Sequence, residues 1–320
     1  MSDKDPKISV IIPTKNRAEM VRRFLPSLAE QATMEPYEII VVDNGSTDST
    51  IEVVTELSSN WPFIRLITES KPGSAAACHA GAIAAKAPLI MFVDDDMLAV
   101  PEFISEHLRS HRENVNACVL GRVVSAESNH PFERMLAYIF DGGRQTLIKG
   151  EPVAVDYWSG NASLSRATYL EMGGYDQVFS SLGYGKDIDF GFRLLERGVN
   201  LVYAANAVTY HHFSERFPER LRKAYRSGQA YGYVKSNYPD LPLPELASAN
   251  TLIPGSLIVP FSRLFAAVIE PFDRGTGRPI MPLAYVYDLA LRYETMRGLT
   301  DYKTGKISFE LPVDTGATSI

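Results

Sequence analysis

The sequence predicts an α/β fold, with a doubly wound, mostly parallel sheet and a helical extension at the C-terminal end of the chain. The first observation is that, up to residue 93, apolar runs rich in Val and Ile alternate with helical patterns. This alternation is typical of βα units, which build a parallel sheet with helices on both faces. The second is that the alternation ends near residue 213, where a charged helical segment and then a proline-punctuated apolar segment follow.

Four strands and three helices are expected in the first part of the chain. The strands are the apolar runs at residues 8–12, 38–42, 63–67 and 89–93. The first helix is expected to start at Asn16, because Glu19 completes a capping-box pattern, and Pro26 should bend or shorten it. The second helix starts near Ser49, and the third is the alanine-rich segment 74–87.

The following part of the chain is predicted to mix strands and helices up to a boundary near residue 213. The expected strands are residues 117–124, 153–157, 200–203 and 207–210. Helices are expected at 166–172 and 187–197, because glycines follow both segments and favour the end of a helix. A further charged helix is expected at 215–235.

The composition indicates a globular protein that neither binds nucleic acid nor spans a membrane. Hydrophobic residues make up 45% of the chain, and its net charge of −6 opposes binding through phosphate neutralisation. The chain contains no uninterrupted run of about 20 apolar residues, the length of a spanning helix. Cys78 and Cys118 lack metal-ligand spacing and are expected to be reduced thiols. The protein is therefore expected to be cytoplasmic.

Three consecutive aspartates follow the fourth expected strand. Asp94, Asp95 and Asp96 come directly after an apolar run, at the edge of the sheet where doubly wound folds bind ligands. Because alternate side chains of an extended segment share a face, Asp94 and Asp96 are expected to point to the same side. Paired carboxylates suit Mg²⁺ or Mn²⁺, which binds through a few carboxylates and substrate phosphates. A solvated acidic turn is the alternative interpretation.

A second polar motif follows the second expected strand. Asp43 and Asn44 lead into Gly45, which permits a tight turn from strand to helix. Their short polar side chains can hydrogen-bond a ribose or the edge of a base, although the same residues are common in ordinary turns. Both interpretations stay open for this motif taken alone.

In order and spacing, these motifs resemble glycosyltransferase family two, the large inverting family with the GT-A fold. The matching segments are residues 9–17 (SVIIPTKNR), 40–48 (IVVDNGSTD), 92–97 (FVDDDM), 173–176 (GGYD), 185–189 (GKDID) and His211. The resemblance covers roughly residues 8–213. It implies a GT-A catalytic domain at 1–213, with a nucleotide-binding half at about 1–97 and an acceptor half at about 98–213, and a helical extension at 214–320.

The resemblance implies a role for each matching residue of the nucleotide-binding half. The residues implied to bind the nucleotide are Pro13, Thr14, Arg17, Asp43 and Asn44. Asp96 is implied to be the metal ligand of the Asp-x-Asp motif, with Asp94 nearer the ribose or sugar of the donor, and Asp95 is counted among the residues of the binding site.

In the acceptor half, the resemblance implies that Asp187 is the general base and that His211 contacts the metal or the diphosphate, with His212 as a fallback. Read without the family, Asp187 is a helix N-cap, a position that Asp often fills. The implied cofactor is a divalent metal, Mn²⁺ or Mg²⁺, which would stabilise the leaving diphosphate as a Lewis acid.

The chain departs from many relatives at two places. Lys186 precedes Asp187 where many relatives carry Glu, which changes the charge of the acceptor site. Cys78-His79 stands where relatives often carry Arg-Asn, so that Lys71 or His79 would have to replace one contact with the donor.

The expected function is the transfer of a sugar from a nucleotide-sugar donor to a hydroxyl of a glycan, lipid-linked or other acceptor. Such a transferase would serve polysaccharide or glycoconjugate biosynthesis. Two alternatives stay open. A sugar nucleotidyltransferase would need a Gly-rich N-terminal loop, which residues 12–16 (IPTKN) lack. A catalytically silent nucleotide-sugar-binding protein would keep the fold without turnover.

The helical extension is expected to touch a membrane surface without crossing the membrane, or else to pack on the catalytic domain or in a possible homodimer. Prolines at 254, 260 and 271 interrupt the apolar segment 252–272, so this segment cannot span a bilayer as a helix. Basic residues of the helix at 215–235 would add attraction to anionic lipid, although ion pairs with neighbouring glutamates are the plainer interpretation.

Overall fold

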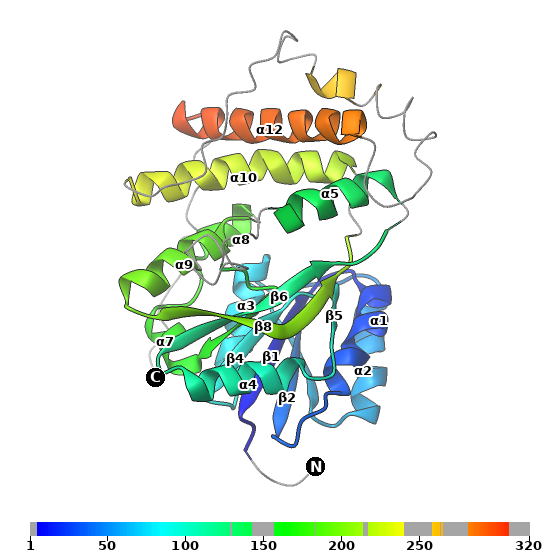
Figure 1. Ribbon diagram of the computed structural model, residues 1–320, viewed down its shortest axis with the longest axis vertical. Coiled ribbons are helices and arrows are strands. Elements are labelled where there is room, and N and C mark those ends of the chain that lie inside the picture. The colour runs from blue at the N-terminus through cyan, green and yellow to red at the C-terminus, as the bar shows by residue number, and fades with distance from the viewer. Residues whose placement is uncertain are drawn as a thin grey trace. The chain divides into compact units, whose positions relative to one another are not determined.

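The computed structural model in Figure 1 describes residues 5–128, 130–142, 157–182, 184–213, 217–239, 258–262, 264 and 281–306. The chain divides into two units. Unit 1 comprises residues 1–128, 136–175 and 186–214, and unit 2 comprises residues 129–135, 176–185 and 215–320. The described strands all belong to unit 1, whereas the described elements of unit 2 are helical.

Within the described residues, the strands form one eight-stranded sheet in the order β3-β2-β1-β4-β7-β6-β8-β5. Their bounds are β1 Ile8–Thr14, β2 Tyr37–Asp43, β3 Ile64–Thr68, β4 Leu89–Val93, β5 Met97–Ala99, β6 Ala117–Ser125, β7 Asn161–Ser165 and β8 Asn200–His211. The pairs β1–β2, β1–β4, β2–β3 and β6–β8 are parallel, whereas β7 is antiparallel to β4 and β6, and β5 is antiparallel to β8. The predicted α/β fold with a mostly parallel sheet is confirmed.

Helices alternate with these strands along the chain (Figure 1). Those of unit 1 are α1 Ala18–Ala29, α2 Thr50–Asn60, α3 Ser74–Ala84, α4 Phe103–Glu113, α7 Arg166–Glu171 and α9 Lys186–Glu196. Those of unit 2 are α8 Val178–Leu182, α10 Phe217–Asn237 and α12 Met281–Lys303, and α5 Pro131–Gly142 has residues in both units.

Strand side chains alternate between two apolar layers, because successive residues of a strand point to opposite faces of the sheet. In β1, Ile8, Val10 and Ile12 belong to the layer that holds the buried residues of α1, α2 and α4. Ile11 belongs to the other layer, together with buried residues of α3, α7 and α9. Both faces of the parallel strands are therefore covered, which explains why their sequences are continuous apolar runs.

The predicted N-cap of the first helix is wrong. α1 begins at Ala18, and the side chain of Arg17, at the cap position, makes no capping hydrogen bond; instead the Asp48 carboxylate accepts one from the Ala18 amide at 3.3 Å. Asn16 has a positive φ of 54°, and its side-chain oxygen accepts a hydrogen bond from the Thr47 amide at 2.7 Å. Asn tolerates this left-handed backbone better than most residues, so Asn16 ties the end of β1 to the loop after β2. Pro26 lies inside the helix, which continues to Ala29.

The second half of the sheet differs more from the prediction. The strands expected at 200–203 and 207–210 form one continuous strand, β8. The strand expected at 153–157 lies, except for Tyr157, outside the described residues. Neither β5 nor β7 has a counterpart among the expected strands. β7 has the polar sequence Asn-Ala-Ser-Leu-Ser, although residues 161–164 are buried.

A buried hydrogen-bond chain explains how the polar residues of β7 are tolerated in the core. Asn161 donates from Nδ2 to Thr209 Oγ1 at 3.1 Å, so its Oδ1 must accept from His107 Nε2, which lies 2.9 Å away. His107 Nδ1 is then an acceptor for the Ser163 hydroxyl at 2.7 Å, and Ser163 accepts from His111 Nε2 at 2.8 Å. Burial lowers the pKa of His107 to about 3 and that of His111 to about 4, so both imidazoles are neutral at pH 7, and the chain links α4 to the middle of the sheet.

We expect the unfolding free energy of the protein to depend on pH because His107 is buried in this histidine chain. Burial lowers the pKa of His107 from 6.5 to about 3. The unfolded chain thus takes up a proton near pH 6.5 that the folded chain refuses, and folding stability falls as the pH drops from 6.5 towards 3. Between pH 7.5 and pH 5 this one group should cost about 2 kcal/mol of unfolding free energy.

The measurement is urea denaturation at both pH values for the parent protein and for His107→Gln, which lacks this titration. Asp94 and Asp95, whose pKa is raised, act in the opposite direction in both proteins and cancel in the comparison. Equal losses of stability in the two proteins would show that His107 is not held neutral.

Unit 2 is built around a close pair of helices, α10 and α12. A side chain at Gly228 would collide with the backbone oxygen of Thr295, and one at Gly298 would collide with that of Tyr225. Glycine at both positions therefore allows the two helices to pack backbone against backbone. The helix expected at 215–235 corresponds to α10. In the described part of the chain, no helix combines the length and the apolar character that crossing a membrane requires.

Candidate active site

The residues implied by the resemblance gather where the parallel strands end. Thr14 and Asp43 are the last residues of β1 and β2 and stand opposite each other in the sheet. The acidic triplet follows β4, the other neighbour of β1. The short strand β5 then pairs antiparallel with the end of β8, which places Met97 opposite His211. This pairing brings the histidine beside the triplet, as a parallel sheet alone would not.

The carboxylates of the triplet are crowded and largely buried. Thr14 Oγ1 donates a hydrogen bond of 2.7 Å to Asp95 Oδ2. The guanidinium of Arg17 lies 3.8 Å from Asp95 and 3.9 Å from Asp96, whose side chains are 11% and 13% exposed. Burial raises the pKa of Asp95 to about 7, although the nearby charge of Arg17 opposes the shift. The cluster therefore favours groups that bring positive charge to it.

Asp94 occupies the inner end of the cluster. Burial and the neighbouring charge of Asp96 raise the pKa of its carboxyl to about 6, while the charge of Lys186 opposes the shift. The chain passes close to it at Gly160, where a Cβ would lie 2.7 Å from both Asp94 Oδ2 and the Trp158 indole. Only glycine leaves the carboxyl and the indole their present positions.

His211 faces Asp96, with its Nε2 3.5 Å from Asp96 Oδ1. Aromatic rings surround the imidazole, at centroid distances of 4.2 Å for Phe213, 5.4 Å for Trp158 and 5.7 Å for Phe140. Its Nδ1 is buried without a hydrogen-bond partner among the described residues. Ring packing rather than hydrogen bonding thus orients Nε2 towards the carboxylate. His212, the fallback, stacks instead on Phe24 at 4.7 Å.

Asp187 lies in the first turn of α9 and is paired with its neighbour in sequence. Lys186 Nζ donates to Asp187 Oδ1 at 2.8 Å and also to Ser159 Oγ. The side chains of Lys186 and Asp187 are 12% and 23% exposed. The N-cap interpretation of Asp187 is not supported, because α9 already begins at Lys186. Ser159 is followed by Gly160, where a Cβ would lie 2.7 Å from Asp94 Oδ2, so the acceptor and donor parts of the predicted site adjoin.

Asp43 and Asn44 shape the loop at the edge of the sheet. The Asp43 carboxylate accepts hydrogen bonds from the backbone amides of Gly45 and Ser46 at 3.1 and 3.2 Å. The Asn44 amide donates to the Lys71 carbonyl and accepts from the Gly73 amide at 2.7 and 2.6 Å. Both side chains are buried, so the structure assigns them a part in forming the loop, and direct contact with a nucleotide stays a prediction.

Cys78 and His79, which stand where relatives often carry Arg-Asn, lie in α3 on the opposite face of the sheet from α1. Cys78 is buried, and burial raises the pKa of its thiol to about 12, which leaves it unreactive. His79 packs beside Tyr169 at 6.0 Å, and its Nδ1 has no hydrogen-bond partner within the described residues. Neither residue is brought to the acidic cluster by a recorded hydrogen bond or ion pair.

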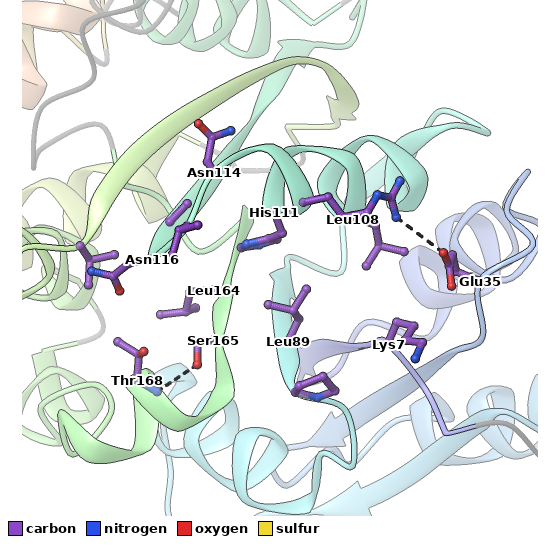
Figure 2. A pocket seen from close by; sticks show the side chains of 15 residues that line it. Lys7, Glu35, Leu89, Leu108, His111, Asn114, Asn116, Leu164, Ser165 and Thr168 are labelled. Carbon is purple, nitrogen blue, oxygen red and sulfur yellow. Dashed lines mark hydrogen bonds and ion pairs between the residues drawn. The ribbon is translucent and has the colours of Figure 1, made fainter.

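A pocket of about 520 Å³ lies at the other edge of the sheet (Figure 2). Lys7 immediately precedes β1, Leu89 begins β4 and Asn116 immediately precedes β6, so its lining belongs to the edge where the parallel strands start. His111, the outer member of the histidine chain, also lines it. The acidic cluster lies at the opposite ends of the same strands, so this pocket is distinct from the candidate active site.

Comparison with protein families matches residues 9–172 to the model described as Glycosyl transferase family 2. The chain belongs to glycosyl transferase family 2. The matched residues of this family 2 chain include the acidic triplet and its neighbours in β1 and β2. Asp187 and His211 lie beyond the match, so the roles expected of them stay predictions.

Characterised relatives cover part of this family 2 chain. Validoxylamine A glucosyltransferase from Streptomyces hygroscopicus subsp. jinggangensis (strain 5008) is 31% identical over 223 residues, which cover 61% of this chain and 52% of that protein. Pre-mycofactocin glycosyltransferase from Mycobacterium tuberculosis (strain ATCC 25618 / H37Rv) is 27% identical over 251 residues, 77% of this chain and 51% of that protein. The chain thus spans about half the length of these relatives.

Two solved structures resemble the family 2 chain over nearly its whole length. Mannosyltransferase PcManGT from Pyrobaculum calidifontis, in complex with GDP-Man and Mn2+, covers 95% of this chain and 89% of its own, with a TM-score of 0.62 and 16% identity. S. aureus TarS 1-349 in complex with UDP covers 93% and 92%, with a TM-score of 0.51 and 17% identity. At these identities the likeness shows the fold, and the predicted GT-A fold is confirmed.

Proposed function

We propose that this chain transfers a sugar from a nucleoside diphosphate donor to an acceptor hydroxyl, with inversion at the anomeric carbon and with the help of a divalent cation. The observation that carries the proposal is the arrangement at the carboxyl edge of the sheet. Asp96 and His211 lie 3.5 Å apart. Lys186, paired with Asp187, donates to the Ser159 hydroxyl, and at the next residue, Gly160, a Cβ would lie only 2.7 Å from Asp94 Oδ2. A group that binds a charged diphosphate and a group that removes a proton thus adjoin.

Asp96 and His211 fit a divalent cation. The described residues hold no group of three or more His, Cys, Asp and Glu side chains suited to a metal, so these two would be the protein's ligands. Diphosphate oxygens and water would complete the shell, which is the usual arrangement for Mg²⁺ and is shared by Mn²⁺. When bound, the cation supplies positive charge that stabilises the leaving diphosphate.

The remaining steps are assigned to residues of the chain. Arg17, now beside Asp95 and Asp96, would bind the negative charge of the diphosphate through its guanidinium. Asp94 would accept hydrogen bonds from hydroxyls of the transferred sugar. Asp187 would accept the proton of the attacking hydroxyl, on the face of the sugar opposite the leaving group.

The proposed donor carries UDP or GDP, and the proposed cation is Mn²⁺. These choices are supported by the TarS structure, which contains UDP, and by the PcManGT structure, which contains GDP-Man and Mn2+. The acceptor is proposed to be a hydroxyl of a glycan, of a lipid-linked intermediate or of another small molecule.

A panel of nucleotide sugars, with and without Mn²⁺, tests this function by thermal shift. A ligand that binds only the folded state stabilises it by about 2.7 kcal/mol when its free concentration is 100 times its Kd. We expect one UDP- or GDP-sugar to raise the melting temperature only with Mn²⁺, and to release nucleoside diphosphate when an acceptor is added. A melting temperature that no nucleotide sugar changes would contradict the proposal.

The same panel separates the two alternative functions. A nucleotide sugar that binds without turnover, with every acceptor tried, would identify a catalytically silent binding protein. Consumption of a nucleoside triphosphate and a sugar phosphate, with release of pyrophosphate, would identify a nucleotidyltransferase.

Contact with a membrane surface remains part of the proposal for unit 2. The apolar segment at 252–272 lies largely outside the described residues, but α10 presents Arg222, Lys223 and Arg226 as exposed side chains. Each basic residue near an anionic surface adds about 1 kcal/mol of attraction at most. We expect the protein to float with vesicles that contain anionic lipid at low salt, and Arg222→Glu with Arg226→Glu to reduce the floated fraction. A protein that stays wholly in the soluble fraction contradicts this.

A further inference from the structure

Lys186 is a buried ammonium with a defined set of neighbours in the acceptor part of the site. In addition to its hydrogen bonds with Asp187 and Ser159, the ammonium lies 4.9 Å from the centre of the Tyr175 ring. A hydrogen bond of 2.6 Å between the hydroxyls of Tyr157 and Tyr175 holds this ring in place. Burial alone would lower the pKa of this ammonium, but the charges of Asp187 and Asp94 outweigh burial and raise it. Lys186 is therefore charged at any pH at which the enzyme works.

The ammonium of Lys186 hydrogen-bonds to only one of the two carboxylate oxygens of Asp187. Oδ1 accepts from Lys186 at 2.8 Å, and in the part of the chain that the structure describes no hydrogen bond is recorded to Oδ2. The hydroxyl of Ser159, which is 2% exposed, fixes the ammonium from its other side. One carboxylate oxygen is thus held by the protein, and the second is left for another partner.

We propose that Lys186 is a positioning residue for transfer: with Ser159 it holds one oxygen of Asp187 so that the other faces the acceptor hydroxyl. This rests on the proposed function, in which Asp187 takes the proton of the acceptor. A carboxylate with a fixed rotamer is worth more as a base than a mobile one, because a misplacement of about 1 Å can cost on the order of 10²-fold in rate. In this proposal Lys186 acts through Asp187 and makes no contact with the donor or the reacting atoms.

The first test replaces Lys186 by Met, which keeps an unbranched side chain as far as Cε and removes the ammonium. We expect kcat to fall on the order of 10- to 10²-fold, with the Kd of the nucleoside diphosphate and Mn²⁺ unchanged in calorimetry. Ser159→Ala leaves the ion pair intact, so it should lose only a few-fold. An unchanged kcat in Lys186→Met, or a loss of nucleotide affinity that accounts for the whole effect, overturns the proposal.

Chemical rescue separates positioning from folding. Lys186→Cys can be treated with 2-bromoethylamine, in which the thiolate displaces bromide and forms a C–S bond, and so restores an ammonium at the end of a lysine-length side chain. The native Cys78 and Cys118 are 1% and 0% exposed, so the parent protein should not react. Transfer should return after this treatment and not after iodoacetamide, which adds a neutral group. Equal recovery with both reagents would mean that only volume is needed.

A double variant distinguishes failure of this proposal from failure of the proposed function. If Lys186 acts through Asp187, Lys186→Met with Asp187→Asn should be no slower than Asp187→Asn alone. Multiplied losses would show that Lys186 acts independently and would overturn the proposal, even with Asp187 as the base. If Asp187→Asn itself retains transfer, it is the assignment of the base that fails.

Discussion

Asp187→Asn should abolish most of the transfer while leaving the fold and the binding of the donor intact. Asn has the same shape and can still accept the hydrogen bond of Lys186 through its side-chain oxygen, but its amide cannot take up the proton of the acceptor. Loss of a general base costs on the order of 10²- to 10⁴-fold in rate. The measurement is kcat with the donor identified by thermal shift, together with the Kd of the nucleoside diphosphate and Mn²⁺, which should not change.

Asp189→Asn is the matched control, because it makes the same change two residues further along α9. The Asp189 side chain is 5% exposed and is paired with Arg193 at 2.8 Å. Arg193 also donates to the backbone oxygens of Met172 and Gly174, so this pair fastens α9 to the loop after α7. Asn keeps a hydrogen bond to Arg193 but removes the charge of a largely buried pair, so the variant should lose some stability and keep the transfer activity of its folded fraction. If Asp189→Asn loses transfer while Asp187→Asn keeps it, the general base is Asp189.

The pattern of apolar runs predicted the parallel half of the sheet well. β4 has the predicted bounds, Leu89–Val93, and the ends of the other three strands lie within two residues of the prediction. Most residues of these strands are buried, which explains why the runs are largely apolar, with Ser9, Glu38 and Arg65 as the exceptions. The rule that ligands bind beyond the ends of such strands then places Thr14, Asp43 and the acidic triplet at one edge.

The antiparallel half could not be predicted in this way, because its stability comes from contacts between distant residues. β7 contains Asn161 and Ser163, which a local reading excludes from a buried strand. Their polar groups are satisfied by His107 and by His111 from α4, more than 50 positions away in sequence. β5, at Met97–Ala99, is too short for any periodicity, although its pairing with β8 brings His211 to the triplet.

The sequence predicted that the acidic residues of the candidate site lie together. It did not predict that the ammonium of Lys186 lies among them. The resemblance marked Lys186 only as a change of charge. Adjacent residues of a helix do not normally face each other. Ser159, which fixes the ammonium next to Asp187, lies 27 positions away and belongs to a loop with no sequence signal of its own. A buried cation between two carboxylates becomes visible only when the loop, α9 and the end of β4 are seen together.

Asp96→Ala should remove the dependence of nucleotide binding on the cation. Asp96 is the carboxylate that faces His211, at 3.5 Å, so the variant would leave the cation with one protein ligand. Changes even in groups that only support metal ligands cost about 10- to 100-fold in metal affinity, and loss of a ligand should cost at least as much. Calorimetry of UDP and GDP with Mn²⁺ and with chelator gives the two affinities whose ratio measures this dependence.

The affinity for UDP or GDP in chelator shows whether Asp96→Ala weakens nucleotide binding itself or only its dependence on the cation. In the parent protein, without a cation, the crowded carboxylates repel the diphosphate, so removing one of them should leave this affinity unchanged or raise it. Asp95→Asn is the matched control: it changes the neighbouring carboxylate, but Asp95 is hydrogen-bonded by Thr14, and the carboxylate that pairs with His211 is that of Asp96. It should keep the gain in affinity that Mn²⁺ confers. If Asp96→Ala also keeps that gain, the cation is held elsewhere and the pairing of Asp96 with His211 serves another purpose.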